Sequence, residues 1–338
     1  MGRWLSDARL LAAVLRDPPA AQALDVDGWN ALWAMARAEQ LAGTLAHRLA
    51  GLDVPPPVDR LIADAMAAAE QGRRQALWEA EMARRALAPL GVPVVLLKGT
   101  AFVAAGLEAG RGRSIGDLDI LVPRSAIDAV EQALITAGWE WVKPDPYDDA
   151  YYRRWMHELP PLIHRDRDRM IDVHHTILPL TARPRPDAAA LIADAVPLAN
   201  GLAVLSPSDM LCHAAAHLFA DGDLSGGLRN LWDIHCLLEE QGSDGLTDRA
   251  ALHGLQVPVA RALRLAHALF GSDVPPSFRR PAASDRRYLD RLTARDGSGR
   301  VTRPLLRQHF YIRSHLIRMP LPMLLRHLLV KWRRGHRG

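Results

Sequence analysis

The sequence predicts an α+β fold in which a small mixed β-sheet core is flanked by N-terminal helices and a C-terminal helical domain. Residues 1–90 are dominated by Ala, Leu, Arg and Glu, which favour helices. After Gly91, short apolar runs at residues 92–97 and 117–122 have the length and composition of buried strands. Helical patterns return after about residue 178. We therefore expect three regions, at residues 1–90, 91–178 and 179–338.

The composition is that of an ordinary soluble globular protein and argues against a disordered, collagen-like or membrane-spanning chain. Apolar residues make up 49% and charged residues 24% of the 338 residues. No apolar run reaches the ~20 residues that a membrane-spanning helix needs, and the first residues lack the pattern of a signal peptide. Together with only two cysteines, Cys212 and Cys236, these features predict a cytoplasmic location.

The positive charge of the chain is concentrated at its C-terminus. Residues 307–338 hold seven Arg, one Lys and no acid, a charge of +8, so the +4 of the whole chain leaves −4 for residues 1–306. This balance argues against a long nucleic acid as partner. The tail, residues 316–334, could lie on an anionic membrane surface. Because Pro320 and Pro322 interrupt it, we favour a terminal helix packed on the protein.

The apolar periodicity and the turn residues place the elements along the chain. Pro55-Pro56-Pro57 precedes a long helix, Ser125 begins a helix that ends near Ala137, and Ser206-Pro207-Ser208-Asp209 is a strong helix start. Strands are expected at residues 92–97, 117–122, 139–142, 159–164 and 170–174. Helices are expected at residues 58–87, 125–137, 206–219, 226–240, 257–270 and 284–295.

Two acidic side chains share one face of the strand at residues 117–122. Because side chains alternate along a strand, Asp117 and Asp119 point one way and Leu118 and Ile120 point the other. Adjacent carboxylates repel each other, which raises the pKa of each, and a divalent cation removes that cost. Hard oxygen ligands of this kind suit Mg²⁺.

The strand at residues 170–174 carries a third carboxylate with the same geometry. Ile171 and Val173 share one face, while Asp172 and His174 share the other. If this strand lies beside the first, three carboxylates converge and can hold two cations about 3.5–4 Å apart, an arrangement that assists in-line phosphoryl displacement. Asp172 is a candidate third ligand or general base, and His174 could orient it or the acceptor.

The turn after the first strand has the features of a phosphate-binding loop. Gly99 lets the backbone approach a ligand closely, and the N–H groups at a helix N-terminus bind phosphate. Thr100 can add a hydroxyl and Lys98 a positive charge. Arg113, four residues before Asp117, could neutralise a triphosphate or the leaving pyrophosphate.

Taken together, these motifs resemble the DNA polymerase beta-like nucleotidyltransferase superfamily. More narrowly, they resemble its uncharacterised bacterial nucleotidyltransferase family over roughly residues 75–240. The string that carries the resemblance consists of Leu97-Lys98-Gly99, Arg113, the run from Asp117 to Val122 and Ile171-Asp172-Val173-His174. The superfamily usually has Gly-Gly or Gly-Ser after the first strand, whereas this chain has Gly99-Thr100.

The resemblance implies transfer of a nucleoside monophosphate from an NTP, with ATP as the first candidate, to an acceptor hydroxyl, with release of pyrophosphate. It implies two Mg²⁺ ions held by Asp117, Asp119 and Asp172. The acceptor could be a small molecule, a sugar, a peptide or a protein side chain. The terminal helical regions are expected to form the acceptor side of the cleft.

Two other functions are compatible with the sequence. One is a catalytically silent module that binds nucleotides or a partner. The other is a metal phosphohydrolase built on His213 and His217, which are four residues apart on one helix face, although packing in a helical core is the favoured interpretation of this pair. Arg229 and Asp233 have the same spacing, and we favour an ion pair on a helix surface; if this helix lines the cleft, either residue could contact the acceptor or the base.

Overall fold

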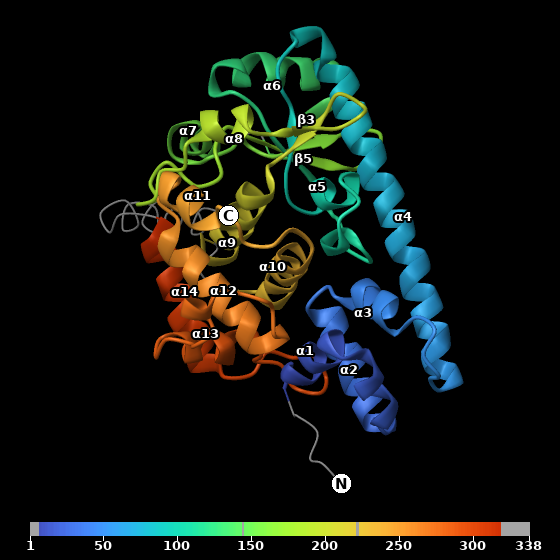
Figure 1. The fold of residues 1–338 in the computed structure, drawn as a ribbon. Helices are drawn as coiled ribbons and strands as arrows, with labels where there is room; N and C mark the ends of the chain where they lie inside the picture. Colours follow the sequence, from blue (N-terminus) through green and yellow to red (C-terminus); the bar gives the residue numbers. More distant parts are fainter. Residues whose placement is uncertain (1–6, 144, 221–222, 319–338) are drawn as a thin grey trace, which may run out of the picture.

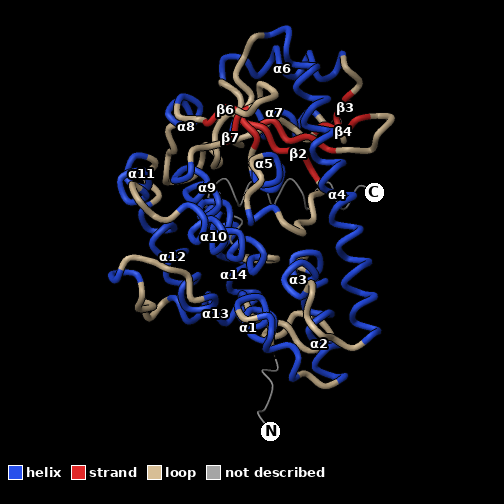
Figure 2. The backbone as a smooth tube through the Cα atoms, turned by 45° about the vertical axis from the view of Figure 1, so that its right-hand side comes forward, coloured by secondary structure: helices blue, strands red, loops and turns tan. Residues whose placement is uncertain are grey.

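The computed structural model describes residues 7–143, 145–220 and 223–318 and confirms the α+β class (Figure 1). A mixed sheet lies toward one end of the molecule, and helices from both ends of the chain gather toward the other (Figure 2). In the described part of the chain, no helix combines the length and the apolar character needed to cross a membrane.

The sheet has seven strands in the described residues, in the order β3-β4-β5-β2-β1-β7-β6. β2 runs parallel to β5 and antiparallel to β1, while β4 is antiparallel to both of its neighbours. β6 and β7 extend the sheet with residues from the range expected to be helical. The strands are β1 (Val95–Leu96), β2 (Asp117–Leu121), β3 (Trp139–Trp141), β4 (Leu162–His164), β5 (Met170–His174), β6 (Val196–Pro197) and β7 (Ala203–Val204).

The six helices predicted individually are present as α4, α6, α9, α10, α12 and α13, whereas α7 lies where no helix was predicted. The Ser206 hydroxyl accepts a hydrogen bond from the N–H of Asp209 at 3.4 Å and so caps α9 as expected. The N-terminal helices are α1 (Arg9–Arg16), α2 (Val26–Ala38), α3 (Ala42–Leu49) and α4 (Pro56–Leu87). Those of the core are α5 (Lys98–Ala104), α6 (Ile127–Thr136) and α7 (Pro146–Trp155). They are followed by α8 (Ala188–Ala193), α9 (Pro207–Ala220), α10 (Gly227–Gln241), α11 (Leu246–Leu252), α12 (Gln256–Phe270), α13 (Asp285–Leu292) and α14 (Pro304–Arg318).

The long helix α4 joins the N-terminal helices to the sheet. It contacts α3, and it also packs on α5, α6 and β2 (Figure 1). Leu118 and Ile120 of β2 are buried, as are Ile171 and Val173 of β5, so the apolar faces of both strands belong to the core. The opposite faces of these strands, which carry the acidic side chains, are therefore free to line a site.

The two terminal helical regions pack against each other. α1 contacts α12, and the N–H of Ala8 donates to the carbonyl of Thr293 at 3.2 Å. α10 contacts the short helix η3 (Glu108–Gly110) of the core, which ties the C-terminal helices to the sheet region. The predicted packing of the basic tail concerns mainly residues 319–338, which lie outside the described residues.

Candidate active site

The parallel pairing of β2 with β5 brings three aspartates together. Asp119 lies opposite Asp172 in the register, and Asp117 lies two residues earlier on the same face as Asp119. One carboxylate oxygen from each of the three side chains lies within 4.8 Å of the others. The convergence of these residues, which are distant in sequence, follows directly from strand alternation and from the adjacency of the two strands.

The surroundings shift the pKa values of the three carboxyl groups in different directions. Burial raises the pKa of Asp117, and the nearby charge of Asp119 raises it further. Burial, Asp119 and Glu158 together raise the pKa of Asp172 to about 7. Burial would also raise the pKa of Asp119, but Lys98 and His174 hold it well below its usual range. The cluster therefore repels further negative charge, and a divalent cation would relieve that repulsion.

In the described part of the chain, Lys98 is the cationic side chain that pairs directly with this cluster. Its Nζ atom lies 2.6 Å from Oδ1 of Asp119, inside a partly buried pair. Lys98 begins α5 with a φ of 50°, a left-handed conformation that costs a residue with a Cβ roughly 1–2 kcal/mol. Such strain persists where the surroundings hold it in place, and the ion pair is one contact that does so.

Gly99 allows Arg113 to approach the turn. A Cβ at position 99 would collide with Nε of Arg113 and crowd its Cδ atom. A larger residue at position 99 would therefore force the Arg113 side chain to move. Lys98, Gly99 and Arg113 consequently form one continuous surface beside the carboxylates.

Arg113 belongs to a buried ionic cluster with Arg229 and Asp233. The Nη1 atom of Arg113 contacts Oδ2 of Asp233, and Nε of Arg229 lies 3.2 Å from Oδ1 of the same carboxylate. Arg229 also donates to Oγ1 of Thr44 at 2.7 Å. The interpretation of Arg229 and Asp233 as a surface pair was wrong, because α3, α10 and η3 bury both side chains. Two guanidinium groups share one carboxylate, which leaves a net positive charge.

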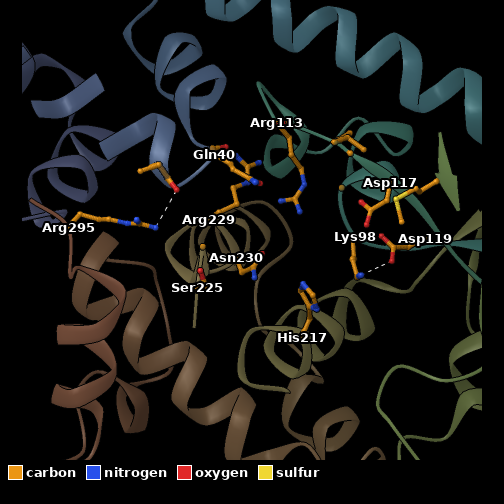
Figure 3. Close-up of a pocket in the computed structure, with 17 residues that line it drawn as sticks. Gln40, Lys98, Arg113, Asp117, Asp119, His217, Ser225, Arg229, Asn230 and Arg295 are labelled. Carbon is orange, nitrogen blue, oxygen red and sulfur yellow. Dashed lines mark hydrogen bonds and ion pairs between the residues drawn. The ribbon is translucent and has the colours of Figure 1, made fainter. Parts of the chain in front are cut away.

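A pocket of about 640 Å³ is lined by Asp117, Asp119, Lys98, Arg113 and Arg229, whereas Asp172 and Asp233 do not line it (Figure 3). Asp117, Asp119 and Lys98 lie on one side of it, and side chains of α10 lie across from them. The lining is mainly polar and comes from α2, the sheet region and the C-terminal helices. It consists of Ala38, Gln40, Lys98, Gly99, Arg113, Ser114, Ile115, Gly116, Asp117, Asp119, Met170, His217, Ser225, Gly226, Arg229, Asn230 and Arg295.

A comparison with protein families gives the class of protein. A family model described as "Uncharacterised nucleotidyltransferase" matches residues 25–271. The chain belongs to this nucleotidyltransferase family. No curated protein matches the chain. The matched range contains every residue that lines the pocket except Arg295, so the pocket of this nucleotidyltransferase is formed almost entirely by the part of the chain that the family shares.

The carboxylate cluster of this nucleotidyltransferase fits the family's expected divalent metal. Its donors are hard carboxylate oxygens, which Mg²⁺ prefers, and its excess negative charge is only partly balanced by Lys98. Asp117, Asp119 and Asp172 are the residues that would hold such an ion.

Some residues singled out in the sequence lie elsewhere. Thr100 is buried, does not line the pocket, and its hydroxyl has no hydrogen-bond partner in the described part of the chain. His213 is also buried, whereas His217 lines the pocket, and their ring centroids are 6.4 Å apart. Neither histidine belongs to a group with metal-ligand geometry among the described residues. This agrees with the favoured interpretation that the pair has a packing or polar role.

Sequence reasoning missed several residues of the site. His174 was named from the sequence, but its partner differs from the expected Asp172 or acceptor: its Nε2 atom donates to Oδ1 of Asp119 at 3.0 Å. Gln40 and Asn230 line the far side of the pocket. Arg295 also lines it and is held by Glu39 at 2.7 Å. Gln40, Asn230 and Arg295 belong to no local motif, because each is placed by contacts between distant segments.

Proposed function

We propose that the protein transfers a nucleoside monophosphate from an NTP, first of all ATP, to an acceptor hydroxyl with the help of two Mg²⁺ ions. The observation that carries this proposal is the convergence of three carboxylates, two of which, Asp117 and Asp119, line a pocket that also holds Lys98, Arg113 and Arg229. Metal ions held by such carboxylates neutralise the phosphates and orient the attacking and leaving oxygens. The membership of a nucleotidyltransferase family supports the same reaction class.

The positively charged residues of the pocket would bind the triphosphate. Lys98 and Arg113, next to Asp117 and Asp119, would hold the triphosphate. The N–H groups of Gly99 and Thr100 in the first turn of α5, which lack intrahelical partners, would add donors. Because the Thr100 hydroxyl is buried away from the lining, its contribution would come from the backbone.

The bond changes are simple. The acceptor oxygen forms a bond to the α-phosphorus while the bond from that phosphorus to the bridging oxygen breaks, and pyrophosphate leaves. Asp172 would take the hydroxyl proton, because its carboxylate lies beside those of Asp117 and Asp119 at the place where the acceptor oxygen would meet the α-phosphorus. The net positive charge of Arg113, Arg229 and Asp233 would stabilise the departing pyrophosphate.

The far side of the pocket would receive the acceptor. Gln40, Asn230 and Ser225 offer hydrogen-bonding groups there, and Arg295 adds a cation (Figure 3). These side chains suit a small polar acceptor such as a sugar, or a side chain of a peptide or protein. The net charge of −4 over residues 1–306 argues against a long nucleic acid.

The proposal is tested with NTPs labelled at the α-phosphate, incubated with the protein, Mg²⁺ and a lysate of the source organism. We expect one labelled product, together with pyrophosphate released in equal amount. The Asp119→Asn variant, matched in folding by circular dichroism, should yield neither. Metal-dependent NTP binding without transfer to any acceptor would contradict the proposed reaction and identify a silent nucleotide-binding module.

A further inference from the structure

A second group of potential metal ligands lies next to the carboxylate cluster but outside the lining of the pocket. It consists of His157, Glu158 and His174, each of which places one ligand atom within 4.8 Å of the others. Oε2 of Glu158 lies 3.6 Å from Nε2 of His157 and 3.5 Å from Nε2 of His174. His174 is almost fully buried, and the other two side chains are mostly buried.

The backbone holds these three side chains in place. Glu158 and His174 form an antiparallel bridge, and the N–H of His175 donates to the carbonyl of His157 at 2.9 Å. The N–H of Leu159 donates to the carbonyl of Val173 at 2.9 Å. The segment that follows α7 is therefore fixed against β5, so the ligand atoms need no rearrangement of the chain to meet.

The hydrogen bonding of the two imidazoles is incomplete. Nδ1 of His157 and Nδ1 of His174 are both buried, and neither has a hydrogen-bond partner within residues 7–143, 145–220 and 223–318. A buried polar atom without a partner costs free energy. Ring contact between the two histidines, with centroids 5.1 Å apart, does not satisfy these nitrogens. The Nε2 atoms, by contrast, are the ring nitrogens that lie near Oε2 of Glu158, and they are the atoms that would bind a metal.

We infer that His157, Glu158 and His174 form a binding site for a transition-metal ion of the Zn²⁺ type. The separations of 3.5 and 3.6 Å are close to the ~3.4 Å edge of a tetrahedron with bonds of about 2.1 Å. Two imidazoles and one carboxylate are a known ligand set of zinc and iron sites, whereas Mg²⁺ prefers oxygen ligands alone. The site is thus distinct in chemistry from the aspartate cluster.

The two sites would share a boundary at Asp119. Its Oδ1 atom lies 3.0 Å from Nε2 of His174, on the side of β2 that carries the carboxylate cluster. If a metal binds Nε2 of His174, this nitrogen no longer donates a hydrogen bond to Asp119. The carboxylate of Asp119 would then face the bound metal instead. The inference concerns metal binding alone and does not depend on the proposed nucleotidyl transfer.

Cobalt provides the test, because Co²⁺ ligated by histidine in a site of low coordination absorbs visible light. The full chain, without a polyhistidine tag and stripped of metal by a chelator, is titrated with Co²⁺. We expect one equivalent to produce the absorption and Zn²⁺ to abolish it. The variants His157→Ala and Glu158→Gln should weaken cobalt binding by more than about tenfold, because each lacks a ligand.

Two controls separate this site from its surroundings. His47→Ala removes an exposed histidine of α3 and should leave the titration unchanged. Asp172→Asn alters the aspartate cluster but removes none of the three ligands and should also keep the visible absorption. Circular dichroism and thermal unfolding of the metal-free variants verify their folding. Absence of the absorption in the parent chain, or its loss in Asp172→Asn but not in His157→Ala, would overturn the inference.

Discussion

The ammonium group of Lys98 lies 2.6 Å from the carboxylate of Asp119, at the point where a divalent cation would also bind. Asp119 is buried, and without a cation its charge would be poorly solvated. The positive charge of Lys98 therefore stabilises the ionised carboxylate of Asp119 in the metal-free protein. The same charge would repel a metal ion that approaches this carboxylate.

Removal of Lys98 should have opposite effects on metal and nucleotide. In Lys98→Ala, Mg²⁺ should bind about tenfold more tightly in the absence of NTP, a change of about 1.4 kcal/mol, because a competing positive charge is gone. NTP binding should weaken by a similar factor, because a contact to the triphosphate is lost. Isothermal titration with Mg²⁺ alone, and then with NTP at saturating Mg²⁺, measures both. Weaker binding of Mg²⁺ would contradict this role of Lys98.

The carboxylates of β2 should be essential for metal-dependent nucleotidyl transfer. Asp117→Asn and Asp119→Asn each remove one negative charge from the cluster, and we expect a loss of transfer of at least about 100-fold. Asp64→Asn, on the exposed side of α4, is the matched control and should behave like the parent. Measurement of pyrophosphate release at several Mg²⁺ concentrations tests this. Full activity in Asp119→Asn would exclude the proposed metal site.

The contact between Gly99 and Arg113 predicts a local effect of a single methyl group. In Gly99→Ala the new Cβ collides with the Arg113 side chain. We expect this to displace the guanidinium and to lower activity by about 10- to 100-fold, with little change in the circular dichroism spectrum. KM for the NTP should rise if Arg113 contacts the phosphates.

Gly72 of α4 provides the control for this substitution. A Cβ there meets no atom within 4 Å. Because Ala favours a helix over Gly by roughly 0.5–1 kcal/mol, Gly72→Ala should stabilise the protein by about that amount. Activity should not change. Equal loss of activity in both variants would show that the effect at Gly99 is not due to Arg113.

Asp209 should make stability depend on pH in the acidic range. Its carboxylate accepts hydrogen bonds from Arg249 at 2.5 and 2.6 Å and lies 3.0 Å from Nε2 of His253. Burial raises the pKa of Asp209, but the contacts with His253, Arg249 and Ser206 outweigh burial and hold it below the ordinary 3.8. This stabilisation is therefore complete above pH 3.8 and is lost as the pH falls through the lower value in the folded protein.

The variant Asp209→Asn isolates this contribution. We expect it to lower the free energy of unfolding by about 2 kcal/mol at pH 7, and the difference from the parent should shrink below about pH 4. Urea unfolding between pH 7 and pH 3 measures the difference. A difference that stays constant over this range would show that the charge of Asp209 does not cause it.

The elements that could be predicted from the sequence are those with a local signal. The strand that carries Asp117 and Asp119 alternates apolar and acidic residues, and this period of two predicts which side chains share a face. Asp172 repeats the pattern on β5, so parallel pairing of the two strands was sufficient to place it near Asp119. Ser206 and the run Pro55-Pro56-Pro57 likewise marked helix starts, although α4 begins at Pro56 and not at residue 58 as expected.

The features that could not be predicted depend on contacts between distant segments. Arg229 and Asp233 have the spacing of a surface ion pair, and only the packing of α10 on η3 and α3 buries them. β6 and β7 are two residues long, too short for any periodicity to reveal them. The choice of Asp119 over Asp172 as the partner of His174 depends on side-chain rotation, which residue spacing does not determine.

The helix α4 also has a mechanical consequence. Its 32 residues form a helix of about 48 Å that contacts α3 and also contacts β2. On its surface, Glu70 pairs with Arg73 and Glu81 pairs with Arg84, each one helical turn apart. One continuous helix thus connects the N-terminal helices to the strand that carries Asp117 and Asp119, so a kink introduced into α4 would change how these two parts of the chain lie relative to each other.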